Sequence, residues 1–310
     1  MVSDRKIAHA LALTEISGIA SGRVRKLVSE SGDIGAIYSA DDDALLDFHF
    51  INEDNIEDIR SSNENVSDWE NRLKSYQNEG IELIFYLEDD YPDRLNEIGG
   101  PLLLYCEGNT SLLKQTGVGF TGSRSASDEA IKWTRSVAKQ LGQSEVIISG
   151  GAEGVDAAAH KGALDAGGQT IVVYGTGLNV PYPEVHEPLF NKVLEENGLL
   201  ISQRPPDAQP SRSGFLNRNE TLSGLSRAVV VAATDGSGGT MTTYEAAKSQ
   251  NRNIYCPDPE LKLKPIGGIR DIIDDDGIPI RDGTEVVHRE SDEDTADDMS
   301  SQSALHEFSG

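Results

Sequence analysis

The stretch SGGAEGVDAAAHKGALDA, residues 149–166, decides the fold of this chain. It follows an apolar run at 146–148, begins with a glycine-rich loop, and continues as an alanine-rich segment typical of a helix. A strand, a glycine turn and a helix N-terminus together can bind phosphate, because glycine lets backbone N–H groups approach a ligand and the helix end is partially positive. A tight strand-to-helix turn without a ligand explains the same residues, so both interpretations remain open.

Around this stretch, short β-branched runs alternate with helical segments. Such alternation is typical of an α/β fold, a parallel sheet with helices on both faces, whose ligands bind beyond the carboxyl ends of the strands. The strands are expected at 118–121, 145–149, 170–174, 199–202, 228–233 and 253–256, and the helices at 128–141, 155–166, 188–196 and 240–250. A short helix and an extended piece are expected within 266–279.

Glycine-bearing loops follow four of these strands, and basic residues accompany them. The loops are TGSR at 121–124, SGGAEG at 149–154, GTG at 175–177 and DGSGGT at 235–240. The cations are Arg124, Lys161, Arg212 and Arg218. An edge rich in backbone donors and cations predicts a phosphate-bearing ligand.

Several familiar catalytic and nucleotide-binding motifs are missing. GTGLNV at 175–180 has two glycines of a dinucleotide loop but lacks the third, and the sequence contains no P-loop, GxSxG elbow or HExxH. His160 is expected to pack or hydrogen-bond within a helix, Asp156 to suit a helix dipole, and Glu245 to be an exposed helix carboxylate. Each of these is favoured over a catalytic role.

The N-terminal part is expected to be a bundle of short helices. Within it, ISGIASGRVRKLV at 16–28 resembles a helix-hairpin-helix, in which turn N–H groups and the basic residues Arg23, Arg25 and Lys26 would meet DNA phosphate. The second glycine of that motif is not in its usual place, and a structural helical cap is the alternative. A helix near 66–76 and strands at 81–87 and 101–106 follow.

The charge of −25 is concentrated in the flanks, since residues 115–257 have a net charge of only −2. Such acidic surface suits a high-salt cytoplasm, where repulsion is screened, although an ordinary cytoplasm is the alternative. Two cysteines without metal-site spacing also fit a reducing cytoplasm, and no apolar run approaches the roughly 20 residues of a membrane span. Residues 289–310 are acidic and unperiodic, which predicts disorder.

Taken in order, several motifs resemble the DprA/Smf family of DNA-processing proteins. They are TGSR, SGGAEGVDAAAHKGAL, GTGLNVPYP, FLNRNETLSGLS and SGGTMTTYEAA, preceded by YPDRLNEIGGPLLLYCEGN at 91–109. The resemblance spans roughly residues 7–280. It implies a helical helix-hairpin-helix or SAM-like domain at 1–75, a Rossmann-like core at 76–285 and a tail at 286–310.

The family resemblance also implies a function. It implies a cytoplasmic homodimer without enzymatic activity, cofactor or membrane association, which binds and protects single-stranded DNA. It further implies help in loading a RecA-type recombinase during transformation or recombination. The alternative is a nucleotide-binding or nucleotide-hydrolysing protein like the LOG-type phosphoribohydrolases, with Glu245 of SGGTMTTYE as its acid.

The resemblance assigns DNA contacts to particular residues. Arg124 matches the arginine of the family's GSR motif, and Phe215, Arg218 and Asn219 match the start of its Phe–x–x–Arg–Asn–Arg motif, where this chain has Glu220 as the last residue. An acid in place of a cation would remove a phosphate contact if it faced DNA. The full expected set is Gly122, Ser123, Arg124, Ser149, Gly150, Gly151, Lys161, Gly175, Gly177, Arg212, Phe215, Arg218, Asn219, Gly238 and Gly239.

Overall fold

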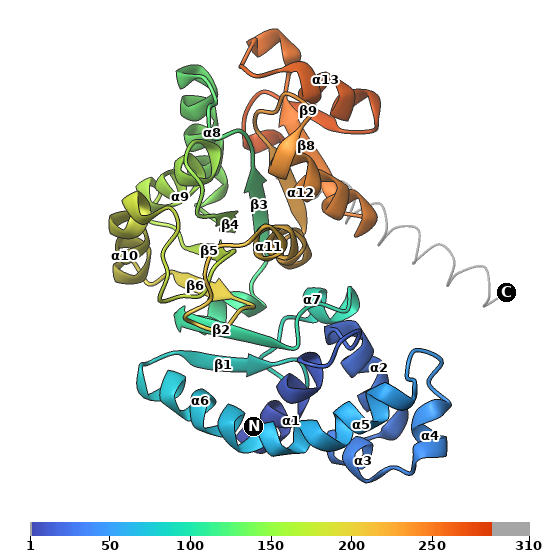
Figure 1. The fold of residues 1–310 in the computed structure, drawn as a ribbon. Helices are drawn as coiled ribbons and strands as arrows, with labels where there is room; N and C mark the ends of the chain where they lie inside the picture. Colours follow the sequence, from blue (N-terminus) through green and yellow to red (C-terminus); the bar gives the residue numbers. More distant parts are fainter. Residues whose placement is uncertain (1, 287–310) are drawn as a thin grey trace, which may run out of the picture. The chain divides into compact units, whose positions relative to one another are not determined.

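The computed structural model describes residues 2–286, and these form two compact units, each discontinuous in sequence (Figure 1). The first unit joins the N-terminal part, which ends at Gln115, to Val173–Leu225. The second joins Thr116–Val172 to the part that begins at Ser226. The domain boundaries expected from the sequence stay predictions. The expected acidic tail lies outside the described residues except for Val286, which is buried in the core of the second unit.

The N-terminal half of the first unit is helical, as expected. Its apolar positions at helical spacing are all buried, and they are Ile7, Leu11, Ile16, Ile19, Val24, Leu27 and Val28. Polar side chains cap the helix starts, as where the Ser3 hydroxyl accepts from the Lys6 N–H. The elements are α1 (Asp4–Thr14), α2 (Ser21–Ser31), α3 (Ile34–Ser39), α4 (Asp42–Leu46), α5 (Glu53–Ser62), η1 (Asn63–Asn65) and α6 (Val66–Asn78).

The remainder of the first unit contains strands that pair antiparallel. β2 (Leu103–Gly108) lies between β1 (Glu82–Phe85) and β6 (Leu199–Ser202), with Leu104 opposite Ile84 and Cys106 opposite Ile201. The strands expected at 81–87 and 101–106 are therefore confirmed. The other elements are α7 (Asp93–Glu97), η2 (Thr110–Lys114), η3 (Glu184–His186), α10 (Glu187–Glu195) and α11 (Arg212–Leu225). The division between the units falls within β5 (Thr170–Tyr174).

The second unit contains four of the strands expected from the sequence, at 118–121, 145–149, 228–233 and 253–256, and pairs them in parallel. The strand order is β4-β3-β7-β8-β9, and each neighbouring pair in it is parallel. The strands are β3 (Gly117–Thr121), β4 (Val146–Gly150), β7 (Ala228–Val231), β8 (Asn253–Pro257) and β9 (Ile278–Ile280). The helices are α8 (Asp128–Leu141), α9 (Val155–Asp165), α12 (Gly238–Ser249), η4 (Pro259–Leu261) and α13 (Gly267–Asp274). The helix and extended piece expected within 266–279 correspond to α13 and β9.

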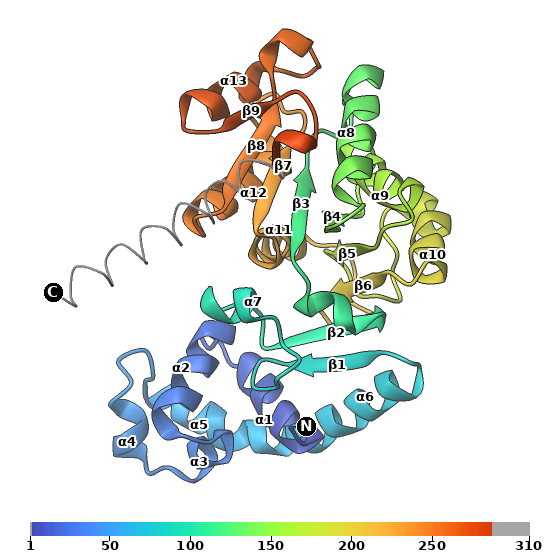
Figure 2. The same cartoon turned by 180° about the vertical axis from the view of Figure 1, so that it is seen from behind.

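Helices cover both faces of this sheet. Successive side chains of a strand point to opposite faces. Accordingly, Val230 packs in a cluster with residues of α8 and α9, whereas Val229 and Val231 pack in a cluster with residues of α12 and α13. Figure 1 and the reverse view in Figure 2 place α8 and α9 on one side of β3 and β7 and α12 on the other. The α/β fold class is confirmed.

Small residues in the stretch 149–166 let α9 approach α8 closely. Gly162 and Ala163 are buried, and a Cβ atom on Gly162 would meet the carbonyl oxygen of Arg135 and lie 2.8 Å from the Ala138 Cβ. A larger residue at 162 would therefore separate the helices. The alanine-rich composition that suggests a helix thus also fixes how that helix packs.

Candidate functional site

The loops after β3 and β4 pack directly against each other in the second unit. A Cβ on Gly122 would lie 2.5 Å from a Val155 methyl group, and one on Gly154 would meet the Ser123 carbonyl oxygen. Gly154 also has a φ of +80°, a conformation that side chains disfavour. The Val155 N–H donates to the same Ser123 oxygen over 3.4 Å. These glycines are required for loop packing, which is independent of any ligand.

Arg124 projects from this loop pair into solvent. The backbone beside it is fixed, because the Ser123 N–H donates to the Ala233 carbonyl over 2.8 Å and the Ser125 N–H to the Ser123 hydroxyl over 3.1 Å. The Arg124 side chain is exposed, and within residues 2–286 its guanidinium has no hydrogen bond or ion pair. A rigid loop therefore presents an uncompensated cation at the carboxyl end of β3.

The start of α9 has a carboxylate of its own. Asp156 is only 4% exposed and accepts a hydrogen bond of 3.3 Å from the Ala152 N–H. Ser149, Gly150 and Gly151 are buried as well, and the Ser149 hydroxyl donates to the Phe120 carbonyl over 2.8 Å. A negative group thus already sits at the positive end of this helix. These buried residues shape the loop and do not themselves present an open phosphate cradle.

His160 is a buried hydrogen-bonding residue. Its Nε2 lies 2.8 Å from the Gly150 carbonyl and its Nδ1 lies 2.8 Å from the Thr170 hydroxyl, which itself donates to the Ile147 carbonyl over 2.6 Å. The ring therefore links α9 to the ends of β4 and β5. The expectation of a packing or hydrogen-bonding histidine agrees with these contacts. Lys161, the next residue, is exposed about 9 Å along the helix from its start.

The loop after β7 has an acid beside its glycines. Gly238 and Gly239 are exposed at the start of α12, but the Asp235 carboxylate accepts from the Ser237 N–H over 3.0 Å and from its hydroxyl over 2.8 Å. These hydrogen bonds hold the pKa of Asp235 below its usual value. Glu245 lies exposed halfway along α12 and has no hydrogen bond within the described part of the chain, as expected for a surface carboxylate.

The loop after β8 also lies at this edge, and the set of DNA-contacting residues expected from the sequence contains none of its residues. Lys262 and Lys264 are both exposed there. The Lys264 carbonyl accepts from the Ser127 N–H over 2.8 Å, so the loop runs beside the segment that carries Arg124. Its position after a parallel strand was the signal that could have identified it.

In the first unit, the predicted glycines are also packing positions. Gly175 and Gly177 are buried. A Cβ on Gly175 would collide with the Phe215 ring, and one on Gly177 would collide with the Pro206 carbonyl. Arg204 donates to the carbonyls of Gly175 over 3.2 Å and Gln209 over 2.7 Å, which fixes these loops.

Helix α11 presents its predicted residues unequally. Arg212, at its first position, is exposed, and Phe215 is half-buried with its ring centroid 5.3 Å from that of Tyr182. Arg218 and Asn219 are only 8% and 5% exposed, whereas Glu220 is exposed. The helix therefore offers Arg212 for direct contact with a ligand and keeps Arg218 and Asn219 inside the fold.

The basic residues of the helix-hairpin-helix-like stretch are engaged within the first unit. Arg25 donates to the carbonyls of Gly100 over 2.9 Å and Pro101 over 3.1 Å, and its guanidinium lies 4.2 Å from the Tyr86 ring centroid. Arg23 donates to the Gly18 carbonyl, and Lys26 lies 3.8 Å from the Glu30 carboxylate. These contacts favour the structural alternative over a DNA contact.

A separate cavity of about 300 Å³ lies behind α11 in the first unit. Its lining includes Trp69, Tyr105, Gln203 and Asn217 but neither Arg212 nor Phe215. Its lining also includes Arg204, Ser213 and Gly214, so the cavity borders the start of α11.

Among the described helices, none has both the length and the apolar composition that crossing a lipid bilayer requires.

Comparisons with known proteins agree with the fold. The chain is 39% identical to the DNA processing protein DprA of Streptococcus pneumoniae over 55% of its length and 60% of that protein. It is 31% identical to the protein Smf of Synechocystis over 80% of its length and 63% of that protein. The chain thus spans less than two thirds of the length of these relatives.

Solved structures extend the likeness over most of the chain. The X-ray structure of DprA from Streptococcus pneumoniae matches with a TM-score of 0.67 at 27% identity, covering 92% of this chain and 93% of that one. DprA from Helicobacter pylori, solved in a study of its single-stranded DNA binding mode, shares the fold with a TM-score of 0.60 at 24% identity, covering 69% and 96%. A family model described as DNA recombination-mediator protein A matches residues 82–290. The chain belongs to the DNA recombination-mediator protein A family.

Proposed function

We propose that this chain binds single-stranded DNA, with backbone phosphates lying along the loops at the carboxyl ends of its parallel strands. The observation that supports this most directly is Arg124, an exposed guanidinium on a rigid loop that has no carboxylate partner within residues 2–286. In a chain of net charge −25, an uncompensated cation at a ligand edge favours an anionic ligand. The names of the family's members, which refer to DNA processing and recombination, support DNA as that ligand.

The expected residues divide by their accessibility. The exposed cations Arg124, Lys161 and Arg212 contact phosphate directly. The glycines Gly122, Gly238 and Gly239 contribute backbone donors, Ser123 holds the loop that carries Arg124, and Phe215 offers an aromatic face. The buried members of the set shape the loops, and they are Ser149, Gly150, Gly151, Gly175, Gly177, Arg218 and Asn219.

The biological role follows the family's. The protein acts in the cytoplasm as a homodimer without catalytic activity, protects incoming strands and helps to load a RecA-type recombinase during transformation or recombination. Because phosphate contacts dominate and aromatic residues make up only 6% of the chain, sequence preference is weak. The nucleotide-hydrolysing alternative gains no support, since Glu245 is an exposed residue in the middle of a helix.

An anisotropy titration of labelled oligo-dT with the full chain tests this function. Arg124→Ala is expected to bind about 10-fold more weakly, because one charge-assisted phosphate contact is lost. Lys139→Ala is the matched control, since Lys139 is also exposed but lies in the last turn of α8, whereas Arg124 precedes that helix. Equal affinities for wild type and Arg124→Ala would refute the assigned contact. Release of a free base from a nucleoside monophosphate, abolished by Glu245→Gln, would support the alternative.

A further inference from the structure

The loop after β8 alternates between buried and exposed side chains. Leu261 and Leu263 pack in a cluster with Ala126 of the segment after β3, Ala130 of α8 and Val155 of α9. Lys262 and Lys264 alternate with these leucines and are exposed. The apolar contacts therefore hold the loop against the segment after β3 while both ammonium groups face solvent.

Backbone hydrogen bonds fix the same placement. Ser127, three residues after Arg124, caps α8 by accepting from the Ala130 N–H, and its own N–H donates to the Lys264 carbonyl over 2.8 Å. The Lys264 N–H lies 3.5 Å from the Ser127 hydroxyl. Lys264 and the Arg124 segment are thus neighbours through main-chain contacts that do not depend on the position of a flexible side chain.

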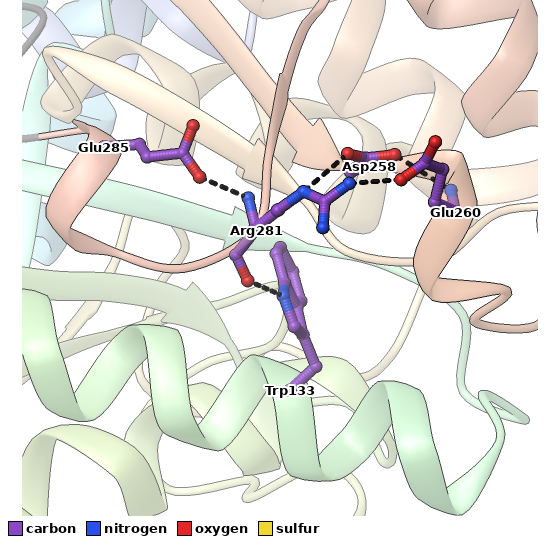
Figure 3. Close-up of polar contacts among 5 residues, drawn as sticks. All are labelled: Trp133, Asp258, Glu260, Arg281 and Glu285. Carbon is purple, nitrogen blue, oxygen red and sulfur yellow. Dashed lines mark hydrogen bonds and ion pairs between the residues drawn. The ribbon is translucent and has the colours of Figure 1, made fainter.

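Arg281 pairs with the two acidic residues of this loop that precede Lys262 and Lys264 in the sequence. Arg281 donates to the Asp258 carboxylate over 3.0 Å and also pairs with Glu260 (Figure 3). Its backbone is held too, because the Trp133 indole donates to its carbonyl over 2.8 Å and its N–H donates to Glu285 over 2.7 Å. Asp258 and Glu260 therefore share Arg281, and neither forms an ion pair with Lys262 or Lys264 among the described residues.

Glu129, in the first turn of α8, is a carboxylate that the charge of Lys264 affects. Hydrogen bonds from its own backbone N–H and the Ser127 hydroxyl, followed by the charges of Lys132 and Lys264, lower the pKa of Glu129. Neither Lys132 nor Lys264 forms an ion pair with Glu129 within 4 Å in the described part of the chain. The charge of Lys264 therefore reaches the first turn of α8, beside the segment that carries Arg124.

We propose that Lys262 and Lys264 form a second phosphate-binding cluster beside Arg124, so that bound single-stranded DNA passes from the loop after β3 to the loop after β8. This inference rests on the proposed function, because it identifies further contacts for the same ligand. It adds to the expected site a loop that has no phosphate-binding sequence motif. Both loops follow parallel β-strands of one sheet. Single-stranded DNA that lies along this edge of the sheet would therefore meet both loops.

The test is the salt dependence of oligo-dT binding by the full chain. The double variant Lys262→Ala/Lys264→Ala is expected to bind at least 10-fold more weakly at low salt. Its slope of log K against log [KCl] is expected to fall in magnitude by about 1.4, since each single-strand phosphate contact contributes about 0.7. Lys262→Arg/Lys264→Arg retains both charges and is expected to keep the wild-type slope.

The matched control is Lys139→Ala/Lys192→Ala, which removes the same charge from two exposed lysines on α8 and α10. It is expected to keep the wild-type slope. A slope in Lys262→Ala/Lys264→Ala equal to that of wild type, together with a reduced slope in Arg124→Ala, would overturn this inference and leave the proposed function standing. Absence of wild-type binding at every salt concentration would overturn both.

Discussion

At the scale of single residues, the solvent accessibility of a side chain distinguishes a ligand contact from a structural contact, which the residue type alone cannot do. Arg124 and Arg25 both lie in stretches that suggest phosphate contact, yet Arg124 is exposed without a partner within residues 2–286, whereas Arg25 donates to the carbonyls of Gly100 and Pro101. Burial lowers the pKa of the Arg25 guanidinium, while the nearby Tyr91 and Tyr86 raise it. Arg124 is therefore accessible to a ligand, whereas Arg25 stabilises the fold.

Arg25→Ala should therefore destabilise the protein without changing its affinity for DNA. We expect a cost of about 2–3 kcal/mol, because two backbone carbonyls lose a charged donor. Urea denaturation should show a lower midpoint, and oligo-dT affinity measured well below that midpoint should match wild type. If affinity fell while stability stayed the same, the helix-hairpin-helix interpretation of residues 16–28 would be correct instead.

At the scale of elements, glycines determine how closely helices and loops approach one another. Gly162 brings α9 against the backbone of α8, whereas Gly22 in α2 has no atom within 4 Å of the position of a Cβ. Both glycines lie inside helices, where alanine is intrinsically favoured by about 1 kcal/mol. The two glycines differ in that Gly162 contacts a neighbouring helix and Gly22 does not.

The substitutions Gly162→Ala and Gly22→Ala should thus have opposite signs. Gly162→Ala is expected to destabilise by about 1–3 kcal/mol, since overpacking against the Arg135 carbonyl outweighs helix propensity. Gly22→Ala is expected to stabilise by up to about 1 kcal/mol. Thermal unfolding of the two variants beside wild type measures both effects. A stabilising Gly162→Ala would mean that α8 and α9 are not in close contact.

Much of the fold could be predicted from the sequence because its signals are local. Alternating β-branched runs and helical periodicity were enough for the strands and helices of the second unit, and turn glycines marked where each strand ends. The roles of those glycines were less predictable, because glycine serves close packing and ligand approach equally well. Gly175 and Gly177 lie in a loop typical of phosphate binding, yet Phe215 and Pro206 fill the space around them.

The candidate site was predictable only in part for a similar reason. Arg124, Lys161 and Arg212 are exposed as a binding role requires. The burial of Arg218 and Asn219 depends on how α11 is packed, which residue type does not indicate. Lys264 approaches Ser127 across 137 residues of sequence, a contact that no local pattern encodes.

At the scale of the whole molecule, the charge of −25 affects folding and DNA binding in opposite ways. Salt screens repulsion among the acidic side chains, since the Debye length falls from about 10 Å at 0.1 M to about 3 Å at 1 M. The melting temperature is therefore expected to rise with KCl over this range while oligo-dT affinity falls. Differential scanning fluorimetry provides the first measurement. A melting temperature that falls with KCl would argue against adaptation to high salt.

The proposed binding of single-stranded DNA depends above all on a phosphate contact at Arg124. Its most direct test compares the slope of log K against log [KCl] for wild type and Arg124→Ala with the same labelled oligo-dT. We predict a linear decrease for wild type and a slope smaller in magnitude by about 0.7 for Arg124→Ala, with Lys139→Ala unchanged. Identical slopes for wild type and Arg124→Ala, or no binding by wild type at low salt, would contradict the claim.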